Sequence, residues 1–270
     1  MEKYTKIRKT MYSVQLTRWA YLINIKSPYT LIKAAYYMET ASLFLFVTQK
    51  IIKSPNFITF LYVLTGVVGS FLLNSSQVAL FYIGIFMVFT KGTFDWADGP
   101  LARRLNKTSF LGHALDTYGA HVIDSAFRVA FVYYTLGYYP DLMFLFPLIA
   151  FILLITKFNL FSDFLYYKSK LENPLDKGNK VRNNEFEEDL KDPKKIKGIA
   201  KWYYSYQSFL DARARSVDFL LLILLVDTMF DYNLSKLLLS LSVLIILRAI
   251  VMYVAGVYFA FKVYKGGAGG

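Results

Sequence analysis

Residues 94–120 read FDWADGPLARRLNKTSFLGHALDTYGA and place Asp95, Asp98 and Asp116 between stretches that are otherwise strongly apolar. Asp95 and Asp98 are three residues apart, so on a helix their side chains leave the same face within one turn. The short polar connection 103–109 returns the chain, so that the next helix can bring Asp116 beside them. This stretch therefore predicts two neighbouring helix ends at which three carboxylates converge.

The sequence around this stretch is typical of a membrane protein. Of its 270 residues, 56% are hydrophobic and 18% aromatic, whereas soluble domains average about 45–50% apolar residues. Six apolar runs have roughly the 17–25 residues that a membrane-spanning helix needs. They lie at 57–73, 77–94, 110–137, 141–165, 216–231 and 235–262. The expected fold class is therefore all-α, a bundle of six transmembrane helices.

Lys and Arg residues are distributed unevenly among the connections. Nine lie within residues 1–53 and twelve within 168–215, whereas the three opposite connections have only Lys236 nearby. The positive-inside rule then predicts that both termini and the acidic cluster are cytoplasmic. Because the cations flank apolar spans, the net charge of +12 indicates contact with anionic lipid rather than nucleic acid.

The chain divides into a few segments by composition. Residues 1–54 form a cytoplasmic N-terminal segment, in which the apolar and aromatic stretch 29–53 predicts a helix lying in the membrane interface. Residues 55–264 form the six-span domain. Within it, 168–200 is a mixed-charge cytoplasmic loop with two prolines. The Gly-rich residues 265–270 are expected to be a flexible tail.

Three carboxylates near a membrane are costly unless they bind each other, a cation or a substrate. Oxygen ligands suit Mg, Mn or Ca, and the absence of cysteine excludes thiolate metal sites. We therefore expect a divalent ion at Asp95, Asp98 and Asp116. The alternative is a solvated acidic pair at the end of a loop.

Small residues flank these aspartates. Gly99, Ala102 and Gly112 leave room for a bulky substrate to approach the helix backbones. Pro100 disfavours a straight helix and predicts a kink or unwinding there. Arg103 offers a planar fork of donors for phosphate oxygens.

The spelling Asp95-x2-Asp98-Gly99-x2-Ala102-Arg103-x8-Gly112-x3-Asp116 resembles the signature of the CDP-alcohol phosphotransferase family, D-x2-D-G-x2-A-R-x8-G-x3-D-x3-D. Seven of the eight fixed positions match. The resemblance covers roughly residues 30–262, including PNFIT at 55–59 where the first span begins. It implies a six-span homodimer with an interfacial N-terminal helix and a cytoplasmic active site at spans two and three.

The resemblance also implies a reaction in phospholipid synthesis. Family members transfer a phosphatidyl or similar phospho-alcohol group from a CDP-linked lipid donor to an acceptor hydroxyl, and CMP leaves. By the match, Asp95, Asp98 and Asp116 hold divalent metal, Mg or Mn, expected as two ions. The residues that shape the nucleotide pocket are Gly99, Ala102, Arg103 and Gly112.

The last aspartate of the signature is missing. Its position holds Ala120, where the family has a metal ligand that also serves as the base for the acceptor's proton. Asp124 is one turn further along and has Arg128 at i+4, while His121 points about 100° around the helix. The chain as given is therefore expected to be impaired. Either one substitution altered an active enzyme, which the intact remainder favours, or the chain is a degenerate member that binds a CDP-alcohol without transferring it.

Four cations within or beside apolar runs are candidates for acceptor recognition: Lys157, Arg213, Arg215 and Arg248. In family members with a phosphorylated acceptor, basic residues in spans four to six form the phosphate pocket, so a phosphorylated alcohol is one candidate acceptor. The alternative is snorkelling or internal pairing, for example of Arg215 with Asp218. A transporter is a further alternative, but it predicts carboxylates spread through the membrane rather than gathered at one side.

Overall fold

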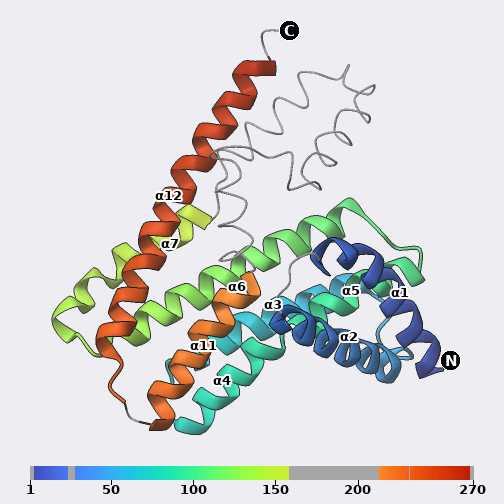
Figure 1. Ribbon diagram of the computed structural model, residues 1–270, viewed down its shortest axis with the longest axis horizontal. Helices are drawn as coiled ribbons and strands as arrows, with labels where there is room; N and C mark the ends of the chain where they lie inside the picture. The colour runs from blue at the N-terminus through green and yellow to red at the C-terminus, as the bar shows by residue number, and fades with distance from the viewer. Residues whose placement is uncertain (1–2, 24–27, 158–212, 231, 268–270) are drawn as a thin grey trace. The chain divides into compact units, whose positions relative to one another are not determined.

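The computed structural model describes all residues except 1–2, 24–27, 158–212, 231 and 268–270, and helices are the only regular elements in the part described (Figure 1). They are α1 (Tyr4–Ile23), α2 (Pro28–Thr48), α3 (Pro55–Leu72), α4 (Val78–Thr90), α5 (Gly92–Arg104), α6 (Phe110–Leu136), the 3-10 helix η1 (Pro140–Leu145), α7 (Phe146–Lys157), α11 (Arg213–Phe230) and α12 (Ser235–Gly267). The expected all-α class is confirmed. The helices form two compact units, one of residues 1–134 with 212–233 and one of residues 135–211 with 234–270.

In the part of the chain that the structure describes, three helices are long and apolar enough to cross a membrane, at Pro55–Leu72, Val78–Arg104 and Ser235–Tyr258. They coincide with the first, second and last of the six expected spans. α6 and α11 occupy the third and fifth positions. The shorter apolar helix Pro140–Thr156 begins the fourth, whose expected end lies outside the described residues. The structure thus supports a helical protein with three candidate membrane spans among the described residues.

The second span is interrupted at Lys91, between α4 and α5. The chain is helical through Pro100, so no unwinding occurs at that proline and the interruption comes about two turns earlier. At the interruption, the Tyr37 hydroxyl of α2 donates a hydrogen bond to the Phe89 carbonyl at 2.8 Å. A side chain from another helix therefore binds a carbonyl at the end of α4, where the regular helix stops.

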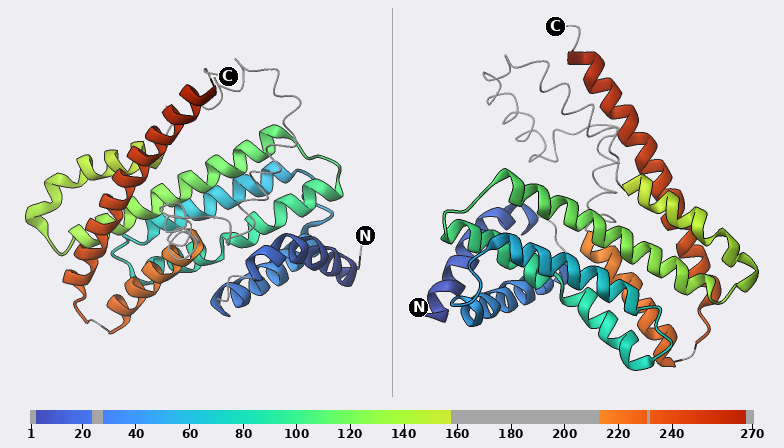
Figure 2. Two further views of the ribbon diagram at one scale, coloured as in Figure 1. Left: turned by 45° about the horizontal axis from the view of Figure 1, so that its top comes forward. Right: turned by 180° about the vertical axis from the view of Figure 1, so that it is seen from behind.

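α3 is the central element of the first unit, because it packs against α4 and α5 and also approaches α6. A Cβ atom on Gly66 would lie 2.6 Å from Ile123 of α6, and one on Gly119 of α6 would lie 2.6 Å from Val63. Only glycine permits such close backbones. Figure 2 shows α3 running alongside α6. This packing brings the acidic parts of α5 and α6 to the same region.

α1 and α2 pack together and against α5. Their shared apolar cluster consists of Ile7, Met11, Ala34, Met38, Ala41, Leu45, Ile58, Ala97 and Leu101. At its edge Glu39 of α2 accepts hydrogen bonds from Arg8 (2.8 Å) and from the hydroxyls of Tyr4 (3.0 Å) and Tyr12 (2.5 Å). The Arg8 hydrogen bond and those from the tyrosines lower the pKa of Glu39 to about 2. α2 is the helix expected over 29–53, whereas α1 was not predicted.

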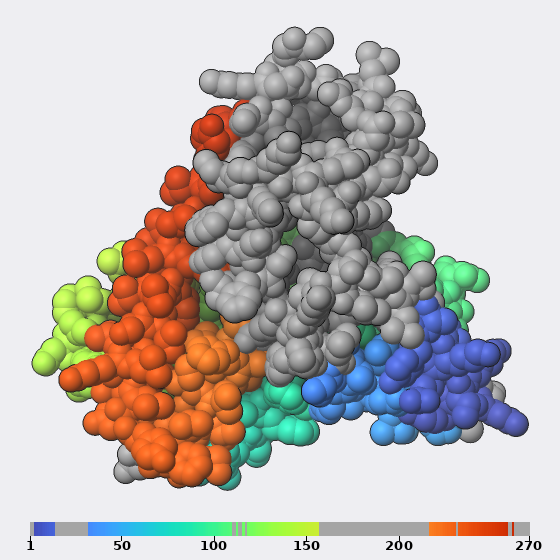
Figure 3. All heavy atoms as spheres, in the orientation of Figure 1, coloured from blue at the N-terminus to red at the C-terminus, as the bar shows by residue number. Residues whose placement is uncertain are grey.

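In the second unit α7 packs against α12. The buried Ser242 hydroxyl of α12 donates to the Thr135 hydroxyl at 3.0 Å. α12, orange to red in Figure 3, exposes the large apolar residues Leu237, Val243, Leu244, Leu247, Val251, Val254 and Tyr258. Its helix reaches Gly267, so residues 265–267 of the expected tail are helical. The expected loop 168–200 lies outside the described residues.

Candidate functional site

Six of the seven matched signature residues line one cavity of ≈ 220 Å³, here called the signature cavity. Its walls come from the start of α3, the end of α5, the connection after α5 and the start of α6. The lining residues are Pro55, Asn56, Thr59, Asp98, Gly99, Ala102, Arg103, Lys107, Thr108, Ser109, Gly112 and Asp116. Residues that are separated in sequence by a loop therefore share one polar space, as the spacing of the aspartates predicts.

Asp98 is held in place by a residue of the first span. Its side chain is 9% exposed, and Thr59 of α3, itself 4% exposed, donates a hydrogen bond to Asp98 Oδ2 at 2.7 Å. Thr59 is not part of the signature. The available signal was its place in the PNFIT segment at the start of the first span.

The two signature glycines lie where side chains would crowd the cavity. A Cβ on Gly99 would lie 3.3 Å from the Arg103 guanidinium, and one on Gly112 would lie 3.3 Å from Asn56 Oδ1. The Gly112 N–H donates to the Ser109 hydroxyl at 3.0 Å. Because these glycines have no Cβ, polar groups lie close to the helix backbones at both positions.

A second cavity of ≈ 410 Å³, here called the Ala120 cavity, begins on the other side of Asp116. Its lining residues are Tyr37, Tyr62, Lys91, Gly92, Asp95, Trp96, Asp116, Ala120, Ile123, Asp124, Phe127 and Val217. On α6, Asp116, Ala120 and Asp124 are four residues apart and therefore share one face. Asp116 lines both cavities, so it joins the signature residues to the space beside Ala120.

The three expected metal ligands approach one another at the junction of the two cavities. Asp95 interacts with both Asp116 and Asp98. Like charges this close repel, and a divalent cation bound to oxygen ligands would stabilise them. The donor set therefore fits Mg or Mn in its chemistry. Within the described ranges, however, no three or more His, Cys, Asp or Glu side chains form a ready metal-binding group.

Asp124 is 5% exposed and forms an ion pair with Arg128, whose Nε lies 3.1 Å from Asp124 Oδ2. This is the i, i+4 pairing expected from the sequence. His121 packs beside Tyr118, with ring centroids 6.4 Å apart, and it is not among the residues that line the two cavities.

The four candidate acceptor residues lie on α7, α11 and α12. Lys157 ends α7, and Arg213 and Arg215 begin α11, but their side chains are outside what the structure describes. Arg248 lies on α12 in the second unit. The role expected for these four residues therefore stays a prediction.

Asp218 of α11, which the sequence suggested as a partner of Arg215, forms an ion pair with Lys33 of α2. Both side chains are 8% exposed, and the Lys33 ammonium lies 5.4 Å from the centre of the Tyr37 ring. Burial lowers the pKa of Lys33, and the Asp218 carboxylate opposes this effect. The pair connects α2 to α11 near the Ala120 cavity, which Tyr37 and Val217 line. The only sequence signal for the Lys33–Asp218 pair was a single lysine within an apolar helix.

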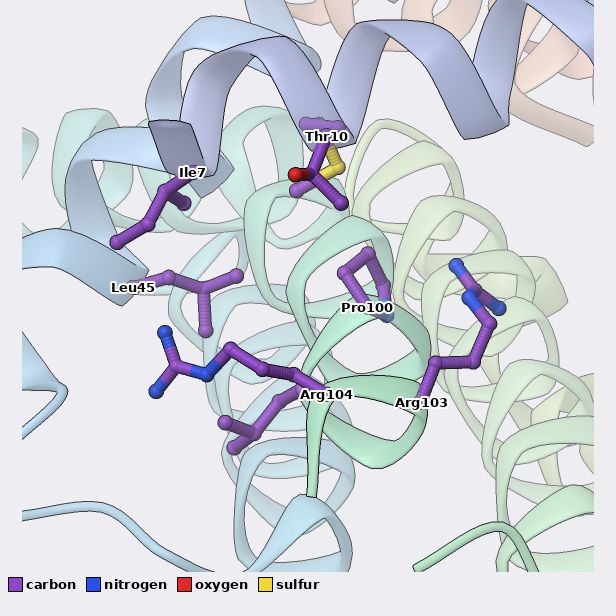
Figure 4. Close-up of a pocket in the computed structure, with 8 residues that line it drawn as sticks. Ile7, Thr10, Leu45, Pro100, Arg103 and Arg104 are labelled. Carbon is purple, nitrogen blue, oxygen red and sulfur yellow. The ribbon is translucent and has the colours of Figure 1, made fainter. Parts of the chain in front are cut away.

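A third cavity of ≈ 270 Å³ lies between α1, α2 and α5 (Figure 4). Its lining is mostly apolar and consists of Ile7, Thr10, Met11, Leu45, Pro100, Leu101, Arg103 and Arg104. In Figure 4 the Arg103 and Arg104 side chains point to opposite sides of α5. Arg103 also lines the signature cavity, so this one residue contacts both spaces.

Fold and site together define a helical membrane protein with carboxylates, small residues and an arginine around one polar cavity. Residues 52–182 match the family profile described as CDP-alcohol phosphatidyltransferase, and the chain carries a domain of this family over those residues. This confirms the resemblance seen in the signature. Membership implies CDP-alcohol phosphotransfer in phospholipid synthesis, and the family is generally metal-dependent. No curated protein and no solved structure matches the chain significantly.

Proposed function

We propose that this protein transfers a phospho-alcohol group from a CDP-linked lipid to an acceptor hydroxyl and releases CMP. The observation that carries the proposal is that Asp98, Gly99, Ala102, Arg103, Gly112 and Asp116 line one cavity in a domain of this family. The geometry gathers a signature that is spread over two helices and the connection between them.

The signature cavity is the proposed donor site. Arg103 and Lys107 provide cationic donors for the diphosphate, and Gly99 and Gly112 let it approach the backbone. Asp95, Asp98 and Asp116 would hold divalent metal, with two ions of Mg or Mn as the expected content. Bound metal supplies positive charge that offsets the diphosphate and the departing CMP.

The Ala120 cavity is the proposed site of the acceptor and of the donor phosphate that is transferred, because it adjoins the signature cavity at Asp116. Its carboxylates and the hydroxyls of Tyr37 and Tyr62 suit hydrogen bonds to an alcohol. Lys157, Arg213, Arg215 and Arg248 stay in the proposal as candidates for binding a phosphate on the acceptor. Ala120 has no group that accepts the acceptor's proton, so transfer by the chain as given is proposed to be slow.

The remaining architecture is part of the same proposal. Six spans with both termini and the active site in the cytoplasm follow from the six apolar runs and the uneven distribution of cations. α2 lies in the membrane interface, where its exposed Ile32, Leu43 and Val47 contact lipid. A homodimer follows from family resemblance.

The test is CMP release by the purified full-length protein and by Ala120→Asp, with a CDP-linked diacylglycerol and a panel of free and phosphorylated polyols. We expect slow or no release by the original chain and metal-dependent, acceptor-dependent release by the variant. Asp98→Asn is the negative control, and chelation with EDTA should abolish both donor binding and release. Donor binding that is unchanged by EDTA, or no donor binding at all, would refute the assignment.

A second candidate function is non-catalytic binding of a CDP-alcohol. The methyl group of Ala120 favours it, because an intact donor cavity next to a missing base can bind without transferring. In that case Ala120→Asp binds donor but releases CMP no faster than the original chain.

A further inference from the structure

Lys91 lies at the interruption between α4 and α5, where it also lines the Ala120 cavity. Its ammonium donates to the Val88 carbonyl at 3.0 Å. An ammonium has three donors, and this bond uses one of them. Lys91 is therefore held at the cavity wall by a contact that does not use its full binding capacity.

The surroundings of Lys91 are strongly charged. It interacts electrostatically with Asp95, Asp124 and Asp218, and with the second ammonium at Lys33. Lys91 precedes Asp95 by four residues, and both line the same cavity. Among the residues described as lining that cavity, Lys91 is the one cation beside the three carboxylates.

This charge arrangement matters because of the alanine at position 120. Compared with a cavity that has an aspartate at position 120 and no lysine, this cavity has one carboxylate fewer and one ammonium more. Carboxylates alone repel a phosphate-bearing group, whereas an ammonium attracts one and donates charge-assisted hydrogen bonds to it. The cavity of this chain is therefore better suited to an anionic group than the family signature by itself indicates.

We propose that Lys91 is a phosphate-binding residue, whose ammonium binds an anionic oxygen of the donor diphosphate at the side of Asp116 that faces Ala120. The proposal rests on the proposed function and adds a residue that lies outside the signature. It differs from a purely structural role, in which Lys91 would only cap the Val88 carbonyl.

The phosphate-binding role predicts that the affinities for Mn²⁺ and for the donor change in opposite directions, whereas a purely structural role predicts that they change together. Without the ammonium, a divalent cation beside Asp95 and Asp116 is repelled less, so Lys91→Gln should bind Mn²⁺ more tightly. The same variant should bind the donor about 10-fold or more weakly at saturating Mn²⁺, the loss expected for a charge-assisted hydrogen bond. A purely structural role predicts that both affinities fall together, because the end of α4 is disturbed.

The experiment measures Mn²⁺ affinity by electron paramagnetic resonance and the affinity for a CDP-linked diacylglycerol by calorimetry, on full-length protein in detergent. Lys91→Arg should restore donor binding, since it keeps the positive charge. Lys50→Gln is the matched control, because it removes one exposed charge outside the three cavities and should change neither affinity. Original donor affinity in Lys91→Gln, or parallel loss of both affinities without rescue by arginine, overturns the proposal.

Inorganic diphosphate, titrated in the same way, separates this proposal from the proposed function. If the original chain binds diphosphate through Lys91 but does not bind the CDP-linked lipid, Lys91 is a phosphate-binding residue and the assigned donor is wrong. If the lipid binds equally well with and without the Lys91 ammonium, the donor assignment stands and the role of Lys91 is wrong.

Discussion

Thr59 of α3 donates a 2.7 Å hydrogen bond to Asp98 of α5, and both side chains are buried. The bond connects the first expected span to the signature on the second. It orients the Asp98 carboxylate beside the other signature residues of the cavity.

Thr59→Val should therefore weaken both the fold and the site. Valine has a similar shape but no hydroxyl, so a buried carboxylate loses a donor, which costs about 1–3 kcal/mol. We expect a lower unfolding temperature in detergent and weaker Mn²⁺ binding. Thr59→Ser keeps the hydroxyl and serves as the control. Unchanged Mn²⁺ affinity in the valine variant would mean that Asp98 needs no orienting partner.

Ala120→Asp should raise the rate of CMP release by roughly 10²–10⁴, the usual contribution of a general base. The new carboxylate would stand between Asp116 and Asp124 on one face of α6. Initial rates with saturating donor and acceptor give the measurement. Asp124→Asn should leave the restored activity largely intact, because Asp124 is already paired with Arg128, whereas Asp116→Asn should abolish it.

If the acceptor carries a phosphate, Arg215→Ala and Arg248→Ala in the Ala120→Asp background should raise the KM for the acceptor much more than the KM for the donor. A lost charge-assisted contact corresponds to about 1.5–3 kcal/mol. Steady-state kinetics with each substrate varied in turn provide the test. Equal effects on both substrates would indicate structural pairing or an uncharged acceptor.

Lys33→Met should destabilise the protein strongly, because it leaves the buried Asp218 carboxylate without its lysine. Removing one partner of a buried ion pair costs about 3–5 kcal/mol. The double variant Lys33→Met with Asp218→Leu should be more stable than the single one, since neither charge of this pair remains buried. Thermal unfolding in detergent measures this. Arg8→Gln, which breaks the exposed pair with Glu39, is the matched control and should have a much smaller effect.

Local sequence patterns determined the fold class, the family signature and one ion pair of this protein. The apolar runs identified an all-α membrane protein, because the length of a spanning helix follows from bilayer thickness. The spacing of Asp95, Asp98 and Asp116 identified the family and predicted that these carboxylates meet. Helical periodicity places Asp95 and Asp98 on one face, and the short connection 103–109 returns the chain so that Asp116 can lie beside them. The same periodicity correctly paired Asp124 with Arg128.

Tertiary structure decided what the spacing leaves open. Thr59 and Asp98 are 39 residues apart, and Lys33 and Asp218 are 185 apart, so their contacts depend on how whole helices pack. The break between α4 and α5 at Lys91 likewise lies beside α2, whose Tyr37 donates to the Phe89 carbonyl. The two cavities that share Asp116 are also lined by residues from several helices, including Tyr37 of α2 and Val217 of α11. Sequence periodicity describes one helix at a time, whereas a cavity is formed by several.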